Sequence, residues 1–496
     1  MEGLVRRIWA KDPSVWGPGD DDPAERLGWL TLPTTMTAEL PRLQRLAEAV
    51  AEEGIETIAL LGMGGSSLAP EVFSRVLGSA PGHPKLVVMD STHPARVRAD
   101  RDGLDLNRTL FIVSSKSGGT VETLSLYRYF RALVDDGNYF IAITDPGTSL
   151  TKLAADEGFR DAFENPPDIG GRFSALSLFG LVPAALMGID IGALLKRAAK
   201  MAESCAPDHA ESSNPGLKLG SDIAAWAQGG RDKLTFCVSD QIDSFGDWVE
   251  QLLAESTGKH GKGIVPVVDE PPVEASVYGP DRTFVNLHSR GDNTHGEFFD
   301  GLVADGHPAV VVDAGEPIDI GAEMFRWEFA TAVAGALLGI NAFDQPDVEA
   351  AKRAGREILG GEEDISFPDG DPARFFEESR PGGLAAILAF APMTDDRRRM
   401  LQDLRWRLAS KGVATLIGFG PRYLHSTGQL LKGGPPGVRA LVVLEEPVGD
   451  EPIPGSEHGF ARLVTAQALG DARAMEAAGR SVTTCKWSTL TAWASD

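Results

Sequence analysis

Two turns rich in glycine and hydroxyl groups have the composition of a phosphate-binding site. In LGMGGSSLAP, residues 61–70, an apolar run ends in glycines and serines before a second apolar run that is helical in pattern. Gly65 would let backbone N–H groups approach an anion, and Ser66 would add a hydroxyl donor. A tight strand-to-helix connection explains these residues equally well. The spacing matches neither a dinucleotide fingerprint nor a Walker loop.

The second turn, VSSKSGGTVET over residues 113–123, gathers three hydroxyls and one ammonium before a helix. These groups belong to Ser115, Lys116, Ser117 and Thr120. A phosphate monoester dianion favours this combination at a helix N-terminus. A simple capping box is the alternative. Two such turns at the carboxyl edge of one parallel sheet favour phosphate binding, because ligands of these folds bind at that edge.

Three further stretches carry groups suited to proton chemistry. In QLLAESTGKHGKG, Gln251 and Glu255 are four residues apart and share a face if the segment is helical. In GINAFDQPDVEAAKRAG, Gln345 and Lys352 are two helical turns apart, and in GGRFSALSLFG, Arg172 follows two glycines. Each group also has an ordinary explanation, as a solvated helix end, an exposed lysine or an ion-pair partner. The residue types alone do not decide between these interpretations.

The elements that would position these residues alternate between apolar strands and amphipathic helices. In the first block we predict strands ending at residues 62, 90, 115 and 145, and in a second, similar block at 239, 288 and 313. This alternation predicts an α/β fold with doubly wound parallel sheets. The predicted units are an N-terminal arm (1–35), a first sheet domain (36–205), a linker (206–228), a second sheet domain (229–358), an acidic Gly/Pro linker (359–381) and a C-terminal α/β block (382–496).

Composition excludes several classes of protein. Of the 496 residues 43% are hydrophobic and 24% are charged, which is typical of globular proteins. The net charge of -24 disfavours nucleic acid and anionic membranes as partners. Cys205, Cys237 and Cys485 form no CxxC pair, which argues against a disulfide framework or a zinc cluster. The apolar stretch 176–195 contains a proline, glycines and an aspartate, so we predict that it belongs to the hydrophobic core and does not span a membrane. We also predict a cytoplasmic protein without a secretory signal.

Five of these stretches together resemble phosphoglucose isomerases, a family built from two sugar-isomerase (SIS) domains. The family motifs GxGGS, SKTxTTxET, GGR(Y/F)S, ESxGK and FDQxGVxxxK correspond in order to LGMGGS, SSKSGGTVET, GGRFS, ESTGK and FDQPDVEAAK. With GFGPRYLHSTGQLLKGG near Tyr423 and a third block, the layout is most similar to the isomerase half of bifunctional transaldolase/phosphoglucose isomerases. The resemblance implies two SIS domains plus a C-terminal block. It also implies conversion of glucose 6-phosphate to fructose 6-phosphate, in glycolysis and gluconeogenesis, without metal or cofactor.

The resemblance implies a role for each matched residue. Glu255 would be the base that moves a proton between C1 and C2 through a cis-enediol, Arg172 would stabilise the negative charge of that intermediate, and Lys352 would assist ring opening. The residues expected to bind the sugar phosphate are Gly65, Ser66, Ser115, Lys116, Ser117, Thr120, Gln251 and Gln345. A carboxylate near carbon-bound protons and a cation near the enediolate oxygen suit this chemistry. We expect Glu255 to titrate above a free glutamate if the site excludes water.

Two departures from the family pattern affect these expectations. SKSGGT lacks one hydroxyl and one side chain of SKTxTT, which would widen the sugar pocket and extend the substrates to mannose 6-phosphate. The family's ring-opening histidine lies in TNGQH, whose nearest counterpart here is GDNTHGEFF. Alignment from the downstream strand places Glu297 at that position, whereas residue type selects His295 as the catalytic candidate. A solvated helix-start histidine is the alternative for His295, and His260 could replace it if its loop folds inward.

Two other classes of protein stay open at this point. A sugar-phosphate sensor would need the phosphate turns but neither Glu255 nor Lys352, and no basic helix-turn-helix candidate is visible. A scaffold would dock a separate transaldolase on the C-terminal block, because the chain is too short to carry that barrel itself. The partners we expect are a small sugar phosphate, neither nucleic acid nor membrane, and, as candidates, a second copy of the chain and a separate transaldolase. The third block could instead cover the dimer interface and leave a monomer.

Overall fold

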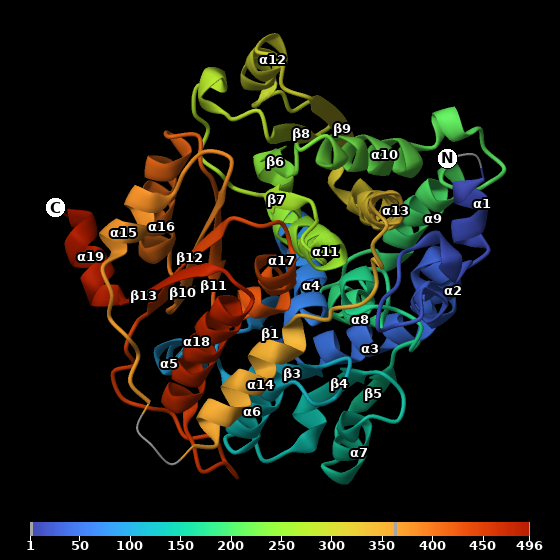
Figure 1. Ribbon diagram of the computed structural model, residues 1–496. Helices are drawn as coiled ribbons and strands as arrows, with labels where there is room; N and C mark the ends of the chain where they lie inside the picture. The colour runs from blue at the N-terminus through green and yellow to red at the C-terminus, as the bar shows by residue number, and fades with distance from the viewer. Residues whose placement is uncertain (1–2, 362–364, 496) are drawn as a thin grey trace.

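Three parallel β-sheets, each flanked by helices, form the computed structural model (Figure 1). It describes residues 3–361 and 365–495, with the backbone alone for residues 348–352. The first sheet has the strand order β2-β1-β3-β4-β5. Its strands are β1 (Thr57–Gly62), β2 (Lys85–Met89), β3 (Thr109–Ser114), β4 (Phe140–Thr144) and β5 (Asp161–Glu164). All its neighbouring strands are parallel, which confirms the predicted doubly wound arrangement.

The second and third sheets have four parallel strands each. The second has the order β7-β6-β8-β9 and the third the order β11-β10-β12-β13. Their strands are β6 (Lys233–Val238), β7 (Val265–Val267), β8 (Arg282–Ser289), β9 (Ala309–Gly315), β10 (Leu384–Phe390), β11 (Ala414–Phe419), β12 (Val438–Leu444) and β13 (Ser481–Lys486). The third sheet confirms that the C-terminal block is a separate α/β unit.

Helices cover the sheet faces, which is why the central strands are apolar along their whole length. β3, β4 and β10 are buried at every residue, as expected for parallel strands covered on both sides. The helices are α1 (Leu4–Trp9), α2 (Leu32–Thr35), α3 (Leu40–Glu52), α4 (Leu68–Leu77), α5 (Pro94–Asp102), α6 (Val121–Arg131), α7 (Ser149–Asp156), α8 (Leu178–Leu186), α9 (Ile191–Ser204), α10 (Pro215–Gln228), α11 (Phe245–Thr257), α12 (Gly296–Ala304), α13 (Ile320–Leu338), α14 (Val348–Leu359), α15 (Pro372–Glu378), α16 (Asp395–Ala409), α17 (Gly428–Gly433), α18 (Phe460–Ala477) and α19 (Trp487–Ser495). Among the described residues, no helix is long and apolar enough to cross a membrane.

The N-terminal arm is part of the main core. Trp29 is fully buried, with its ring 5.3 Å from that of Phe173 and 5.7 Å from that of Phe325. Trp16 Nε1 donates to the carbonyl of Ala332 in α13 at 2.8 Å. Burial of two indole rings is a large apolar contribution, so the arm is packed into the main core rather than standing apart from it.

The expected linker over residues 206–228 must be corrected, because most of it is α10. Asn214 caps this helix by accepting from the backbone N–H of Leu217 at 2.8 Å, and Pro215 occupies the first turn. Leu217 and Ile223 are buried on the face that packs against α13. The polar residues before Pro215 do connect two elements, but the helix that follows them was not predicted from the sequence.

The second expected linker, residues 359–381, also contains a helix. Asp371 caps α15 by accepting from the N–H of Ala373 at 2.9 Å. Phe375 and Phe376 are buried in the core of the C-terminal block, and the ring of Phe376 stacks on that of Trp493 at 4.4 Å. Acidic, Gly and Pro residues therefore flank a short structural helix here.

Helices from all three units meet at the centre of the molecule (Figure 1), where α11 contacts both α4 and α17. Ala254 of α11 shares a buried cluster with Leu430 and Leu431 of α17. On the other side, Phe460 and Leu463 of α18 complete the core on the outer face of the first sheet. The C-terminal block is thus packed against α11 and the first sheet, next to the residues singled out for chemistry.

Candidate active site

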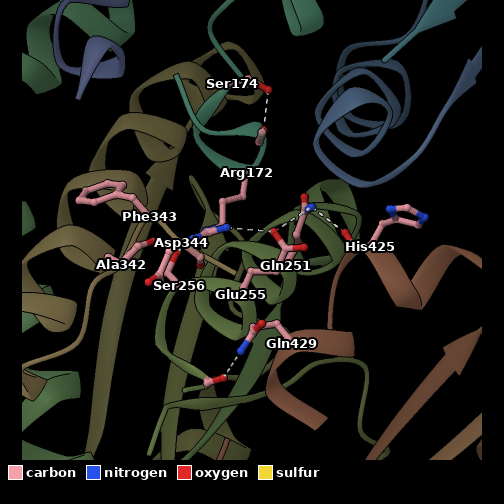
Figure 2. Close-up of polar contacts among 12 residues, drawn as sticks. Arg172, Ser174, Gln251, Glu255, Ser256, Ala342, Phe343, Asp344, His425 and Gln429 are labelled. Atoms are coloured by element: carbon pink, nitrogen blue, oxygen red, sulfur yellow. Dashed lines mark hydrogen bonds and ion pairs between the residues drawn. The ribbon is translucent and has the colours of Figure 1, made fainter. Parts of the chain in front are cut away.

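Gln251 and Glu255 lie on one face of α11, as their spacing predicted. Both side chains are 3% exposed, and Gln251 Nε2 lies 3.5 Å from Glu255 Oε2 (Figure 2). Most of α11 is buried, because it is enclosed by α4, α13 and α17. A glutamate at the end of such a helix has little access to bulk water.

Arg172 supplies the charge that faces this carboxylate. It sits in a 3₁₀ turn, η8 (Gly171–Phe173), and is 1% exposed. Its Nη1 lies 3.4 Å from Glu255 Oε2, and its Nε donates to Ser256 Oγ at 2.7 Å. Its Nη2 donates to the carbonyls of Ala342 and Asp344 at 2.6 and 3.1 Å. These contacts fix the guanidinium plane, so the cation cannot move away from Glu255 without breaking several hydrogen bonds.

Burial and charge act in opposite directions on the pKa of Glu255. Burial raises this pKa above its ordinary value, while the charges of Arg172 and His425 oppose the rise. The net upward direction confirms the expectation for a closed site. A carboxylate with a raised pKa is a stronger base at neutral pH, which suits removal of a carbon-bound proton.

Lys259, in the ESTGK motif, was not singled out by its sequence context. Its side chain is fully buried, and its Nζ donates to the carbonyls of Asn341 and Asp344 at 2.5 and 2.6 Å and to Asp344 Oδ1 at 2.6 Å. Burial, followed by the charge of Arg172, lowers the pKa of Lys259 to about 7. Since Arg172 donates to the same Asp344 carbonyl, the two cations together hold the segment that joins α13 to α14.

The first glycine-rich turn, η5 (Gly64–Ser66), packs directly against the turn that carries Arg172. A Cβ added at Gly65 would lie 2.1 Å from the carbonyl oxygen of Gly171, which leaves no room for a side chain. Ser174 Oγ donates to the Gly65 carbonyl at 3.3 Å. Ser66 is largely buried at the end of this turn. The first phosphate candidate and the arginine are therefore brought together by backbone contact.

The second turn presents two of its hydroxyls to each other. Ser115 Oγ and Thr120 Oγ1 are 2.8 Å apart across the loop, and Ser117 is exposed. The ammonium of Lys116 pairs with Asp145 Oδ2 at 2.5 Å. Gly118 has φ +68°, and the space beside it is filled by Thr148. The loop is therefore compact, with Ser115 and Thr120 as its paired hydroxyl groups.

Two other predicted residues, Gln345 and His260, are exposed, and a third, Lys352, has no described side chain. Gln345 is exposed on the segment between α13 and α14. Lys352 lies in α14, but its side chain is outside the described residues. His260 is exposed, with φ +54°.

His295 lies at the opposite end of α11 from Glu255. Its Nε2 is 3.0 Å from the carbonyl oxygen of Val238, at the end of β6, just before α11 begins at Phe245. Residues 245 to 255 span about 15 Å of helix. Among the described contacts, none joins His295 to Glu255 or Arg172.

A different histidine, His425, touches the cluster and was not predicted. Gln251 Nε2 donates to its carbonyl oxygen at 2.7 Å, and its ring Nε2 lies 3.0 Å from Glu122 Oε1. It belongs to η13 (Arg422–His425) of the C-terminal block. The only signal in the sequence is a histidine among serine, threonine and glycine in PRYLHSTGQ, a stretch far from the other motifs.

Comparisons with known proteins show which family this chain resembles. A family model described as phosphoglucose isomerase matches residues 47–270. A glucose-6-phosphate isomerase from Rubrobacter xylanophilus is 30% identical over 379 residues, covering 66% of this chain and 87% of that protein. A probable glucose-6-phosphate isomerase from Natronomonas pharaonis is 31% identical over 380 residues, covering 68% and 86%.

Solved structures show the same fold. A hypothetical protein from Thermus thermophilus aligns with a TM-score of 0.63 and 26% identity, over 73% of this chain and 94% of that one. A glucose-6-phosphate isomerase from Chlamydia trachomatis aligns with a TM-score of 0.55 and 21% identity, over 72% and 78%. The strand-and-helix arrangement predicted from the sequence is thus shared with both.

Proposed function

The chain belongs to the phosphoglucose isomerase family, and we propose that Glu255 and Arg172 carry out its interconversion of glucose 6-phosphate and fructose 6-phosphate. One observation supports this assignment of residues. The buried Glu255 carboxylate and Arg172 guanidinium lie 3.4 Å apart, and the turn that carries Arg172 packs against the first glycine-rich turn. A sensor would need the turns but would gain nothing from burying this pair, which is costly to desolvate.

The proposed chemistry follows from the position of the two charges. With the open-chain aldose bound, Glu255 takes the proton from C2, and the electron pair moves to form the C1–C2 double bond of an enediol. Charge then develops on the C1 oxygen, where Arg172 stabilises it, and this oxygen takes up the proton that the C2 hydroxyl gives up. Glu255 returns its proton to C1 as the C2=O double bond of the ketose forms. The hydrogen bonds from Arg172 to two carbonyls and Ser256 mean that the cation needs no reorientation during the reaction.

The phosphate group completes the proposal. Ser115 and Thr120, whose hydroxyls face each other, bind it together with Ser66 of the first turn. The ammonium of Lys116, which is paired with Asp145, adds positive charge near the phosphate. Gly65, Ser117, Gln251 and Gln345 complete the proposed binding set. The family resemblance implies that Lys352 assists ring opening together with a histidine, for which His295 is the candidate by residue type.

Compartment and assembly are further parts of the proposal. We place the reaction in the cytoplasm, in keeping with the three free, buried cysteines. Self-association and binding of a separate transaldolase are tested by size exclusion of the protein alone and mixed with that enzyme.

A coupled assay of fructose 6-phosphate conversion, run with EDTA, tests the base. Glu255→Gln keeps the shape of the side chain but cannot accept the proton, so we expect kcat to fall by about 10²- to 10⁴-fold. Glu203→Gln, the same change at an exposed position on α9, is the matched control and should retain full activity. Wild-type turnover that survives in Glu255→Gln would refute the assignment.

A further inference from the structure

The C-terminal block places His425 between the phosphate turns and the base. A Cβ at Gly64 would lie 2.4 Å from the carbonyl oxygen of His425 and 3.0 Å from its Cβ. Gln251, one helical turn before Glu255, donates to the same carbonyl. His425 is therefore held against the first turn and α11 by contacts that tolerate no larger residue at Gly64.

The ring of His425 is oriented by a buried carboxylate. Glu122 Oε1 lies 3.0 Å from His425 Nε2, and the Glu122 side chain is 6% exposed. Gln467 Nε2 donates to the same oxygen at 2.8 Å, while Gln467 Oε1 accepts from Thr92 Oγ1 at 2.6 Å. Because an ionised carboxylate only accepts hydrogen bonds, Nε2 carries the proton and Nδ1 is the atom that can exchange one. Among the described residues, none makes a hydrogen bond to Nδ1.

The position of the His425 ring relative to Glu255 and the phosphate loop suggests which part of a bound sugar it would meet. In Figure 2 the ring stands beyond Gln251 as seen from Glu255. Its partner Glu122 lies in the first turn of α6, two residues after Thr120 of the phosphate loop. A hexose 6-phosphate bound between Glu255 and that loop has its reacting carbons, C1 and C2, at one end and its phosphate at the other. The ring oxygen is bonded to C5, next to the phosphate-bearing carbon, and so faces the position of His425.

We propose that His425 of the C-terminal block, positioned by Glu122, is the acid–base group that opens and closes the sugar ring. This inference rests on the proposed isomerase function. On opening, the C1–O5 bond breaks, its electron pair goes to O5, and O5 takes the proton from Nδ1. The O1 hydroxyl proton leaves as the C1=O1 double bond forms, and it recharges the imidazole through water. The net change is the transfer of one proton from O1 to O5.

Anomer exchange tests ring opening separately from isomerisation. An opened glucose 6-phosphate ring can reclose to the other anomer without any proton leaving C2. The rate of α–β exchange above the spontaneous rate, measured by NMR, therefore reports on ring opening without the proton transfer by Glu255, while the coupled assay requires both steps. We expect His425→Asn to lower both rates by about 10²- to 10⁴-fold. Glu255→Gln should lose isomerisation and keep anomer exchange.

Matched variants decide the outcome. His209→Asn makes the same change at an exposed histidine and should keep both rates. Full anomer exchange in His425→Asn, or its loss in His295→Asn instead, would overturn the proposal. A wild type that exchanges anomers but does not isomerise would refute the isomerase function, while loss of that exchange in His425→Asn would still support ring opening.

Glu122→Gln tests the residue that positions His425. It also provides a second test of the proposal if His425→Asn fails to fold. Its amide oxygen can still accept from His425, but it does not stabilise the imidazolium. We expect anomer exchange to fall by about 10- to 10³-fold, with the midpoint of its pH profile moved to lower pH. A purely structural role for Glu122 would leave that midpoint where it is in the wild type, and this result would overturn the proposed dyad.

Discussion

Glu328 gives the protein a large dependence of stability on pH. It lies in α13, is fully buried, and neither of its carboxyl oxygens has a hydrogen-bond partner among the described residues. Burial raises the pKa of Glu328 well above its ordinary value. The folded protein therefore holds this carboxyl protonated up to a higher pH than the unfolded chain does. Unfolding then releases a proton, so stability falls as pH rises above the unfolded pKa of about 4.3.

The size of the effect follows from this difference in protonation. Each pH unit between about 4.3 and the folded pKa costs about 1.4 kcal/mol of stability. Glu328→Gln removes the titration, so its gain in stability over the wild type should be near zero at pH 4.5 and rise with that slope. Glu328→Met also removes the unpaired polar group and should add about 1–3 kcal/mol at every pH.

Urea unfolding of the three proteins between pH 4.5 and 8, followed by tryptophan fluorescence, measures these differences. Comparing each variant with the wild type at the same pH cancels the titration of all other groups. A Glu328→Gln gain that is constant over this range would refute the reasoning. It would mean that the carboxyl is ionised in the folded state, or that it has found a partner.

Three further predictions concern the site and its supports. Gly65→Ala should lower kcat by about 100-fold, because the added Cβ pushes on the Gly171 carbonyl and displaces Arg172; Gly301→Ala, where the Cβ meets no atom within 4 Å, is its control and should leave kcat unchanged. Asn214→Ala should destabilise the protein by about 1 kcal/mol through loss of the α10 cap, seen as a lower Tm. The acidic limb of the pH profile of kcat should have its midpoint above 4.5, because the pKa of Glu255 is raised; a midpoint at or below 4.5 would contradict this.

The fold could be predicted to the extent that local pattern decides it. Strands such as β3 and β10 are apolar runs bounded by polar, glycine or proline residues, so their positions were clear. α10 and α15 were missed because the chain around them is polar, acidic or rich in proline, and their apolar faces are short. In both cases tertiary packing, on α13 and on the C-terminal core, stabilises a helix that composition disfavours.

The site was predictable where its residues share a motif. Gln251 and Glu255 are one turn apart on a helix, and the burial of that helix made them neighbours in a closed site. The pairing of Arg172 with Glu255 joins residues 83 positions apart and followed only from the family resemblance. His425 is 303 residues from Glu122, and no local periodicity links the two. Contacts of that kind depend on how whole units pack.

The contact between Glu122 and His425 also sets the order in which the enzyme becomes active during synthesis. At about 5–20 residues per second, a ribosome needs roughly 15 to 60 seconds to add the 303 residues that separate them. Both SIS domains have left the ribosome by then, and they carry Glu255, Arg172 and the phosphate turns. If His425 opens the ring, a nascent chain could bind the open-chain sugar long before it could use the cyclic form that predominates in solution. Activity on cyclic substrate would then begin only when the C-terminal block had folded.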